Sequence, residues 1–313
     1  MSVYIERWDG EHHSACRIFD IVELCHPLLP KADRAHVLNL ISSRNRGYEN
    51  SAFVAWNKNQ ICGFAMIFSG PVDDAVKVVG AVDPEKQNQG VGTALLKQIN
   101  AELTRFPYLQ MVNAEAFESC SKGIRFIKKA GFTESDRLYW NTRSVDTPFP
   151  KWAQQKILTA LNGFRFMRAS EFENIRTDWD LAWYRIYAEI VKDIPSTIRI
   201  EAPPFDIWRK NIDPPLAKRS HIVMALVGQD PVGSIWLGDI DRGKININHT
   251  GVAASHRRNG LSLALKFKAF ELAKQLGAHS VTTQNHHHNP MRELNQRLGF
   301  KTLDALVSFT KAV

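Results

Sequence analysis

The stretch QNQGVGTALL, residues 87–96, returns in similar form as RRNGLSLALK at residues 257–266. Each residue of the first stretch lies 170 positions before its counterpart, so that Gly90 corresponds to Gly260. The same spacing relates identical residues on both sides of the loop, namely Ala55 and Ala225, Gly63 and Gly233, Val82 and Val252, Ala94 and Ala264, and Leu95 and Leu265. A register kept without insertion from residue 55 to residue 95 predicts one fold written twice in the chain.

Length and composition agree with a duplicated globular fold. The chain has 313 residues, which is typical of about two domains, with 44% hydrophobic and 23% charged residues. No apolar run approaches the roughly 20 residues of a membrane span, and the first residues show no secretion signal. Four cysteines without a CxxC pair fit a reducing compartment better than a disulfide framework or a zinc site. We therefore expect a cytoplasmic protein that does not enter the membrane.

The formal net charge of +8 admits an anionic partner. An acidic cofactor satisfies this charge as well as a nucleic acid does, and the Lys and Arg residues are scattered along the chain. An RNA-associated module is one alternative, but no basic stripe interleaved with aromatic residues is visible. A nucleic acid partner is therefore not expected.

Each copy shows the same order of predicted elements: strands, a glycine loop, a helix, a further strand, a second helix and a closing strand. In the first copy the two helices are expected at about residues 92–103 and 121–129, and in the second at about 261–276 and 290–298. Prolines at 148 and 150 are typical of a linker. We expect domains at 1–147 and 163–313, joined by a linker at 148–162, each with a mixed α/β sheet.

The glycine loops have the form of a phosphate site. A strand, a short glycine loop and a helix together present free backbone N–H groups at the positive end of the helix dipole, where phosphate oxygens bind. Gln87 or Arg257 at the start of the loop can add a side-chain donor. Neither copy has the third glycine of a Rossmann loop or the Gly-Lys-Ser/Thr of a Walker loop. A plain turn at a helix start is the alternative for either loop alone, and the duplication favours a seat for a diphosphate.

At this point the residues resemble a known family. The pattern from Val82 through Gln87, Gly90 and Gly92 to Leu95 looks like the acetyl-CoA signature of the GNAT N-acetyltransferase superfamily, and residues 252–265 resemble it again. Residues 126–132 and 294–300, which each end in Gly-Phe, resemble the later motif of that family. The layout is similar to that of the mycothiol synthase family, although no residue assigns its substrate.

The resemblance implies two tandem GNAT-like domains, each a mixed sheet splayed between its fourth and fifth strands, with helices on its faces. It implies acetyl-CoA as cofactor and an amine of a small molecule or peptide as substrate, acetylated by direct attack on the thioester; we expect a monomer or homodimer. The cofactor-binding residues expected are Ala81, Val82, Gln87, Asn88, Gln89, Gly90, Val91, Gly92 and Thr93 in the first copy, and Gly251, Val252, Arg257, Arg258, Asn259, Gly260, Leu261, Ser262 and Asn285 in the second.

The catalytic residues are harder to place. Many members of the family have a tyrosine acid four residues before Gly-Phe, where this chain has Ile127 and Asn295. Ile127 cannot donate a proton, whereas Asn295 can hydrogen-bond a sulfur atom. His249 is the candidate base that titrates near neutrality, and a hydrogen-bonded strand histidine is its alternative reading. Glu115 is expected as an exposed loop carboxylate.

Other polar residues near the second loop have simpler explanations. Asn289 followed by Pro290 predicts a helix cap. The run of His286, His287 and His288 has side chains that point in different directions and no Cys or carboxylate partner, so we expect no metal site there. Trp183 and Trp236 are candidates for the wall of a substrate pocket.

Arg257, Asn285 and His249 make the second copy our expected catalytic domain, with the first copy binding acetyl-CoA structurally. A non-catalytic acyl-CoA-binding or sensing protein is the alternative, because neither copy has the tyrosine. The acceptor pocket is expected from about residues 12–50 and 170–220, which carry no motif that names the amine.

Overall fold

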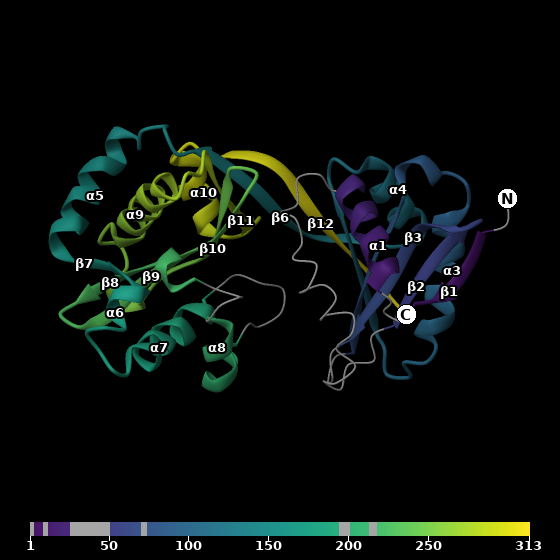
Figure 1. The fold of residues 1–313 in the computed structure, drawn as a ribbon, viewed down its shortest axis with the longest axis horizontal. Coiled ribbons are helices and arrows are strands. Elements are labelled where there is room, and N and C mark those ends of the chain that lie inside the picture. The colour runs from purple at the N-terminus through teal and green to yellow at the C-terminus, as the bar shows by residue number, and fades with distance from the viewer. Residues whose placement is uncertain (1–2, 9–11, 26–50, 70–73, 194–200, 213–217) are drawn as a thin grey trace. The chain divides into compact units, whose positions relative to one another are not determined.

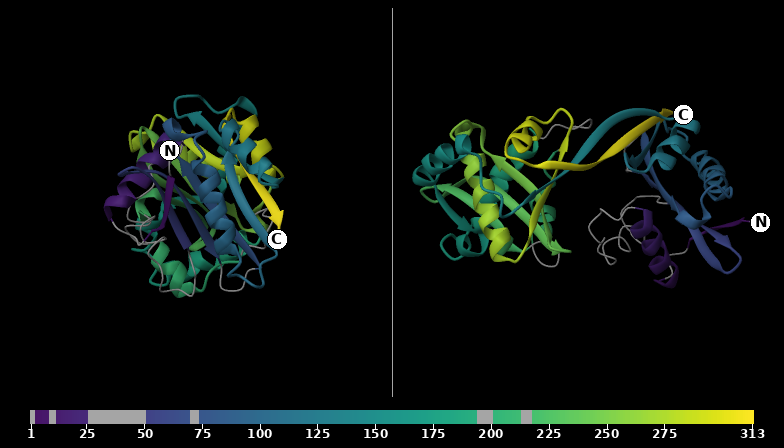
Figure 2. Two further views of the ribbon diagram at one scale, coloured as in Figure 1. Left: turned by 90° about the vertical axis from the view of Figure 1, so that its right-hand side faces the viewer. Right: turned by 90° about the horizontal axis from the view of Figure 1, so that it is seen from above.

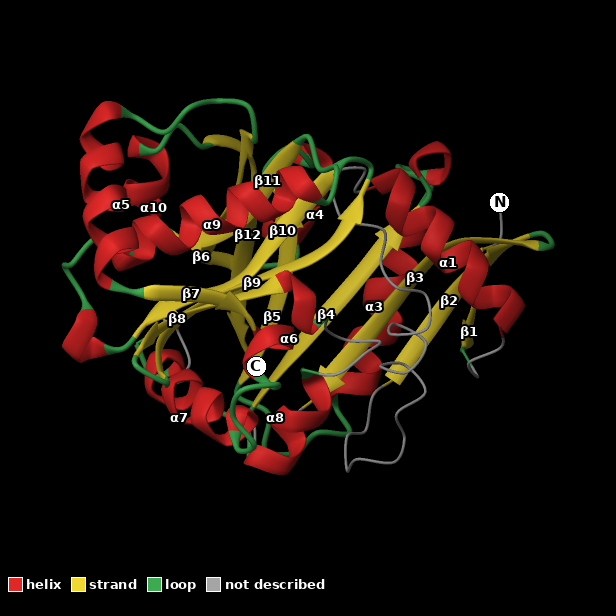
Figure 3. Cartoon of the chain, turned by 60° about the vertical axis from the view of Figure 1, so that its left-hand side comes forward, coloured by secondary structure: helices red, strands yellow, loops and turns green. Residues whose placement is uncertain are grey.

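The computed structural model describes residues 3–8, 12–25, 51–69, 74–193, 201–212 and 218–313. The chain forms two compact units (Figure 1). Unit 1 comprises residues 1–137 together with 305–313, and unit 2 comprises residues 138–304. Each unit is a mixed sheet with helices on both faces, as Figure 3 shows by secondary structure.

Unit 1 contains the first glycine loop. Its elements are β1 (Val3–Arg7), α1 (His12–Cys25), β2 (Ser51–Asn57), β3 (Gln60–Ser69), β4 (Ala75–Val82), the 3-10 turn η1 (Pro84–Lys86), α3 (Val91–Leu103), β5 (Met111–Phe117), α4 (Ser121–Lys129), the first part of β6 (Thr133–Ser144) and most of β12 (Lys301–Ala312). The strand order is β1-β2-β3-β4-β5-β12-β6. Only the β4–β5 pair is parallel among the registers described for this sheet.

Unit 2 repeats this plan with additional helices. Its elements are α5 (Lys151–Gly163), β7 (Arg165–Arg168), α6 (Ala169–Phe172), α7 (Trp179–Val191), α8 (Phe205–Asn211), η2 (Arg219–His221), β8 (Ile222–Val227), β9 (Asp230–Asp241), β10 (Lys244–Val252), η3 (Ala254–His256), α9 (Leu261–Gln275), β11 (Ser280–His286) and α10 (Pro290–Arg297). The strand order is β12-β6-β11-β10-β9-β8-β7, and β10 and β11 are the parallel pair.

The last strand of each repeat completes the sheet of the other unit. The second part of β6 pairs with β11 in unit 2, from Leu138 opposite His286 to Ser144 opposite Ser280. The C-terminal strand β12 pairs with β5 in unit 1, from Leu306 opposite Phe117 to Ala312 opposite Met111. Figure 2 shows this strand in yellow, reaching the C-terminus in unit 1. Unit 1 therefore depends on the last residues of the chain.

Each sheet has one hydrophobic core on either face. In unit 1, α3 packs on one face through Val91, Leu95 and Ile99, and α1 packs on the other through Ile18 and Ile21. In unit 2, the core on the α9 face includes α5, and the core on the other face lies under α7 and α8.

The duplicated glycines before the loop have the same role in both units. A β-carbon on Gly63 would lie 3.2 Å from side-chain atoms of Val91 and Leu95, and one on Gly233 would lie 3.1 Å from Leu265. These glycines on β3 and β9 therefore let the helix after the loop approach the sheet closely. The repeat spacing of the sequence thus reflects one packing arrangement that occurs twice.

The expected fold class, two mixed α/β sheets flanked by helices, is confirmed. The compact units are divided differently from the expected domains 1–147 and 163–313, because the closing strands are exchanged. Residues expected in the linker form α5, whose Ala153 and Ile157 are buried in the core of unit 2. Pro148 and Pro150 precede a helix here rather than a flexible connection, because proline is common at the start of a helix.

No helix within the described ranges combines the length and the apolar character needed to cross a membrane.

Candidate functional site

In both units the parallel strand pair separates halfway along its length. In unit 1 the pairing of β4 with β5 ends at Val78 and Ala114, although both strands continue beyond. In unit 2 the pairing of β10 with β11 ends at Ile247 and Thr283. We call these openings the split of unit 1 and the split of unit 2. The splayed sheet expected from the resemblance is therefore present in both copies.

The glycine loop of unit 1 lies at the end of β4 and leads directly into α3. Gly90 has φ +85° and Asn88 has φ +62°, both in the left-handed region that glycine and asparagine tolerate best. The first hydrogen bond of α3 is donated by the amide of Ala94 to the carbonyl of Gly90, at 3.0 Å. The amides of residues 91–93 precede that bond, so they have no acceptor within the helix and can bind an anion.

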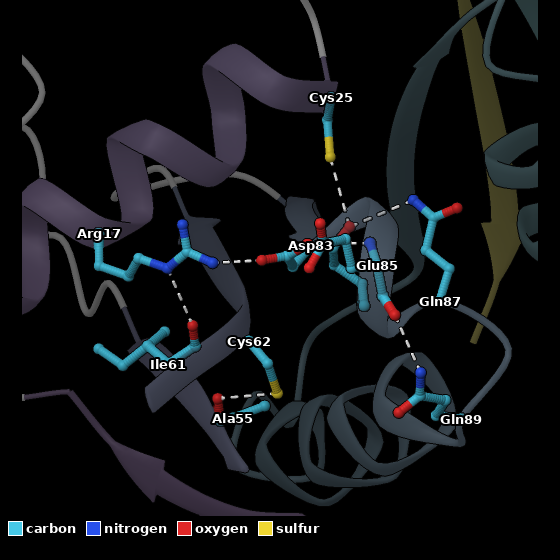
Figure 4. Close-up of polar contacts among 10 residues, drawn as sticks. Arg17, Cys25, Ala55, Ile61, Cys62, Asp83, Glu85, Gln87 and Gln89 are labelled. Atoms are coloured by element: carbon cyan, nitrogen blue, oxygen red, sulfur yellow. Dashed lines mark hydrogen bonds and ion pairs between the residues drawn. The ribbon is translucent and has the colours of Figure 1, made fainter. Parts of the chain in front are cut away.

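Polar contacts hold this loop against β4 and α1 (Figure 4). Gln87 Nε2 donates to the carbonyl of Val82 at 3.2 Å, and the thiol of Cys25 lies 3.4 Å from the same oxygen. Asp83 accepts from the amide of Glu85 at 2.9 Å and pairs with Arg17 of α1. Gln87 therefore braces the loop in this structure, rather than extending as a free donor toward a ligand.

A cavity of about 330 Å³ runs through the split of unit 1. Its volume is within the range of small-molecule pockets. Its wall comes from β4, β5, the glycine loop and helices α3 and α4. Its polar lining residues are Cys25, Gln87, Asn88, Thr93, Glu115, Cys120 and Lys122. Seven residues expected to bind cofactor in the first copy line this cavity, namely Ala81, Val82, Gln87, Asn88, Gly90, Gly92 and Thr93.

Glu115 lines this cavity and has polar partners on neighbouring strands. It lies within β5, so the expectation that it belongs to an exposed loop was wrong. Its Oε2 atom lies 2.6 Å from Lys77 Nζ, and Ser308 of the exchanged strand β12 donates to its Oε1 at 3.4 Å. An ionised carboxylate in this position is able to accept a proton at the mouth of the split.

The position of the family's acid is occupied by Ile127, which lines the cavity and offers no proton. The thiol of Cys25 also lines it, and burial, followed by the nearby Cys120 and Asp83, raises the pKa of Cys25 to about 11. Cys25 is therefore a neutral thiol near pH 7 and a poor nucleophile.

Unit 2 has different groups at its split. Asn295 is 1% exposed, and its Nδ2 donates to Oδ1 of Asn285 at 2.8 Å. Among the described residues the Oδ1 atom of Asn295 has no hydrogen-bond partner. The structure thus brings together the two asparagines that the sequence placed near the thioester and the cofactor arm.

His249 is placed on β10 beside Tyr187, with ring centroids 5.3 Å apart. Burial lowers the pKa of His249 to about 4, and within the described part of the chain its Nε2 atom has no partner. The ring is therefore neutral near pH 7, and a base with so low a pKa accepts a proton from an ammonium group poorly.

In the loop of unit 2 the backbone of α5 lies close to Gly260, although Arg258 and Asn259 are exposed. A β-carbon on Gly260 would lie 2.8 Å from the carbonyl oxygen of Lys156 in α5, whereas one on Gly90 would meet nothing within 4 Å. Arg257 donates through Nε to the carbonyl of Val252 at 3.0 Å, and its Nη2 lies 2.5 Å from Asp193. The guanidinium is thus neutralised by a carboxylate of the same unit.

The walls of the two splits differ at matched positions. Leu96 and Gly80 line the cavity of unit 1, and the repeat spacing places Lys266 and Thr250 at the same points in unit 2. Lys266 is 2% exposed, and burial lowers its pKa to about 8. No carboxylate of the described residues forms an ion pair with it. Burying an ammonium in this way is costly, so the split of unit 2 carries a strained cation where unit 1 has a leucine.

The remaining expected cofactor residues lie in or beside the two loops. Gln89 donates through its side chain to the carbonyl of Glu85 at 2.9 Å, and Val91 is buried at the start of α3. In unit 2, Gly251, Arg258, Asn259, Leu261 and Ser262 occupy the equivalent positions around η3 and the start of α9.

Three further expectations concern unit 2. Asn289 caps α10 by accepting from the amide of Met291 at 2.9 Å, as predicted. Trp183 is 1% exposed and donates to Ser234, so it belongs to the core rather than to a pocket wall. No group of three metal-binding side chains occurs among the described residues.

Residues 26–50, 194–200 and 213–217 of the expected acceptor regions lie outside the described residues.

Sequence reasoning did not propose Cys25, Cys120, Lys122 or Phe126 as site residues, although each of them lines the cavity of unit 1. The four-residue spacing of Lys122 and Phe126 would have placed both on one face of the predicted helix at 121–129. The two cysteines belong to different elements, α1 and the turn before α4, and no local pattern brings them to the same cavity.

Family models match both copies. Residues 49–134 match a model described as the acetyltransferase (GNAT) domain, and residues 182–300 match one described as the acetyltransferase (GNAT) family. The two ranges together span more than half of the chain, and each contains one glycine loop with the helix that follows it. No curated protein has a sequence that matches this chain.

Solved structures share the whole architecture. A GCN5-related N-acetyltransferase from Sphaerobacter thermophilus is 17% identical with a TM-score of 0.72, covering 99% of this chain and 95% of that chain. A tandem GNAT protein from the clavulanic acid biosynthesis pathway is 14% identical with a TM-score of 0.68, covering 99% and 98%. At these identities the likeness shows the fold, including its duplication. The family models and the shared fold together show that the chain belongs to the GNAT superfamily of acetyltransferases, with two GNAT domains in tandem.

Proposed function

We propose that the protein is an acetyl-CoA-dependent N-acetyltransferase that holds the coenzyme in unit 1 and acetylates an amine of a small molecule or peptide. One observation carries this proposal: the cavity of about 330 Å³ joins the open glycine loop to the split between β4 and β5. Unit 1 is thereby favoured over unit 2, which reverses the assignment that the polar residues of the second copy suggested.

The residues of unit 1 fit the coenzyme in three respects. The amides of residues 91–93 and the positive end of α3 suit a diphosphate. The space beside Gly90 is open, since an added β-carbon there would meet nothing within 4 Å. Residues 79–82 of β4 have no paired strand on their β5 side, so their backbone groups on that side, other than the Val82 carbonyl that Gln87 occupies, are available to the amides of the pantetheine arm. When bound, acetyl-CoA supplies an activated acetyl thioester.

Proton transfer defines the next requirement. The acceptor amine must be neutral to attack, and Glu115 is the carboxylate that the cavity offers for its proton. Lys77 Nζ lies 2.6 Å from Oε2 of Glu115 and holds the carboxylate in place. Ile127 supplies no acid, so solvent would protonate the product thiolate.

Release of free thiol from acetyl-CoA across a panel of amines tests the proposal. We expect turnover by the wild-type chain and its loss in Gly90→Asp. A carboxylate in the loop repels the diphosphate and should weaken acetyl-CoA binding by at least about tenfold. Gly90→Asn is the matched control, since asparagine has the same shape, tolerates the positive φ and carries no charge. Equal loss of turnover in both variants would contradict an electrostatic role for this loop.

A non-catalytic acyl-CoA-binding protein is the second candidate, and Ile127 at the position of the acid favours it. It predicts that acetyl-CoA binds to unit 1 while no amine in the panel increases thiol release. Steady thiol release that depends on an amine and on Glu115 excludes it.

A further inference from the structure

Helix α4 presents an aromatic ring to the glycine loop of unit 1. Phe126 is 39% exposed and lines the cavity. Two carbons of its ring lie 3.4 and 3.5 Å from the position that a β-carbon on Gly92 would take. The ring therefore faces the first turn of α3, whose amides form the proposed seat of the diphosphate.

A cation lies on the same face of the helix. Lys122 precedes Phe126 by four residues, one helical turn, and also lines the cavity. The helix also carries Arg125, Lys128 and Lys129 and has no acidic residue. Within the described chain no carboxylate forms an ion pair with Lys122. The wall of the cavity beside the loop is thus one exposed aromatic face with an unpaired ammonium next to it.

Unit 2 lacks both features at the matched positions. When Gly131 is aligned with Gly299, Leu294 corresponds to Phe126 and Pro290 corresponds to Lys122. Leu294 packs against the core of unit 2. The aromatic ring and the cation are therefore not a requirement of the fold, because the second copy builds the same helix without them.

We propose that Phe126 stacks on the adenine ring of coenzyme A and that Lys122 binds its 3′-phosphate. This inference rests on the proposed function and names its donor class: a thioester of free, nucleotide-bearing coenzyme A, rather than a phosphopantetheine thioester on a carrier protein. A base stacks well on an exposed aromatic face, and an ammonium beside a phosphate forms a charge-assisted hydrogen bond.

Calorimetric titration of the full chain with coenzyme A, 3′-dephospho-coenzyme A and phosphopantetheine tests the inference. For the wild type we expect dephospho-coenzyme A to bind about threefold more weakly than coenzyme A, as for one partly exposed charge pair. Phosphopantetheine should bind at least about tenfold more weakly than coenzyme A, because it lacks the base that stacks. Lys122→Gln should abolish the difference between coenzyme A and its dephospho form, whereas Lys129→Gln, on the same helix but outside the cavity lining, should keep it.

Phe126→Leu introduces the leucine that unit 2 has at the matched position. It should weaken the binding of coenzyme A about tenfold and leave the affinity for phosphopantetheine unchanged. Phe126→Trp should restore affinity for coenzyme A, and thermal melting checks that both variants fold. Equal affinity of the wild type and Phe126→Leu for coenzyme A overturns the inference and leaves the proposed function standing. No binding of coenzyme A by the wild type removes the proposed function itself.

Discussion

The side chain of Ile190 in α7 lies directly over Gly251 on β10, so that a β-carbon added to the glycine would overlap its Cγ2 atom. The matched residue of unit 1 is Ala81, which lines the cavity and also packs beside the core on the α1 face. The same strand position is therefore open in one unit and covered in the other. This difference, with the close approach of α5 to Gly260, supports the proposal that unit 1 holds the coenzyme.

Gly251→Ala should destabilise unit 2, since the added methyl group overpacks a filled site. Overpacking of this kind costs about 1–3 kcal/mol. Thermal or urea unfolding should show the loss, and the same change should cost less in an Ile190→Ala background than in the wild type, because the overlapping side chain is gone. A loss that Ile190→Ala does not reduce would show that the contact is not its cause.

Lys266→Leu, which introduces the residue found at position 96, should stabilise unit 2 near pH 7. Burial lowers the pKa of Lys266 from 10.5 to about 8. Between these values the unfolded chain binds more protons than the folded one, so the free energy of unfolding rises with pH through this window. The rise is roughly 3 kcal/mol for a shift of this size.

Urea unfolding at several pH values from 7 to 10.5 measures this effect, and the variant should lack the rise that Lys266 contributes. Lys268→Met, at a half-buried position of the same helix, is the control and should keep it. A wild-type stability that falls across this window in the same way as that of Lys266→Leu would contradict the account.

Glu115→Gln should lower turnover by about 10²-fold or more while leaving the affinity for coenzyme A nearly unchanged, because the amide keeps the shape and cannot accept the proton. Glu118→Gln is a matched change just beyond β5, at a side chain that pairs with Arg137. Its turnover should match that of the wild type. Steady-state rates with the best amine decide between these outcomes, and full activity of Glu115→Gln would exclude Glu115 as the base.

His249→Gln should leave the pH profile of turnover unchanged. With its pKa at about 4, His249 remains neutral from about pH 5 upward and contributes no limb near neutrality. A limb between pH 6 and 7 in the wild type that disappears in His249→Gln would restore the histidine as the catalytic base and unit 2 as the active domain.

Removal of residues 305–313 should disrupt unit 1 and spare unit 2, because these residues form the strand that pairs with β5. Hydrogen exchange should report lost protection across residues 111–117 and retained protection across residues 244–247, which pair with β11 within unit 2. Coenzyme A binding should be lost with the strand. Retained protection at β5 in the truncated chain would mean that the exchanged strand is dispensable.

Much of the fold was predictable because its strongest determinants are local. The helix after Gly90 and the helix after Gly260 follow from glycine at a positive φ and from apolar spacing, and both begin within one residue of the prediction. The split of the sheet came from the family resemblance. Strand exchange was not predictable, since Leu138 and Ala305 sit in strands whose partners are set by tertiary packing rather than by their own pattern.

The candidate site was predictable as a loop and not as a pocket. The spacing of Gln87 and Gly90 predicts a phosphate-binding loop. The space beside Gly90 is open, whereas α5 lies close to the matched Gly260, and no local pattern shows this difference. The sequence suggested that the side chains of Asn285 and Asn295 are available to a ligand, and the structure shows them hydrogen-bonded to each other. Burial and pairing decide what a polar side chain can do, and neither is visible in a motif.

The stoichiometry of coenzyme A binding tests the central claim most directly. Calorimetry of the full chain should find one coenzyme A per chain, lost in Gly90→Asp and unchanged in Asn259→Asp, which adds the same charge to the loop of unit 2. Binding that survives Gly90→Asp and disappears in Asn259→Asp would contradict the account and place the coenzyme in unit 2.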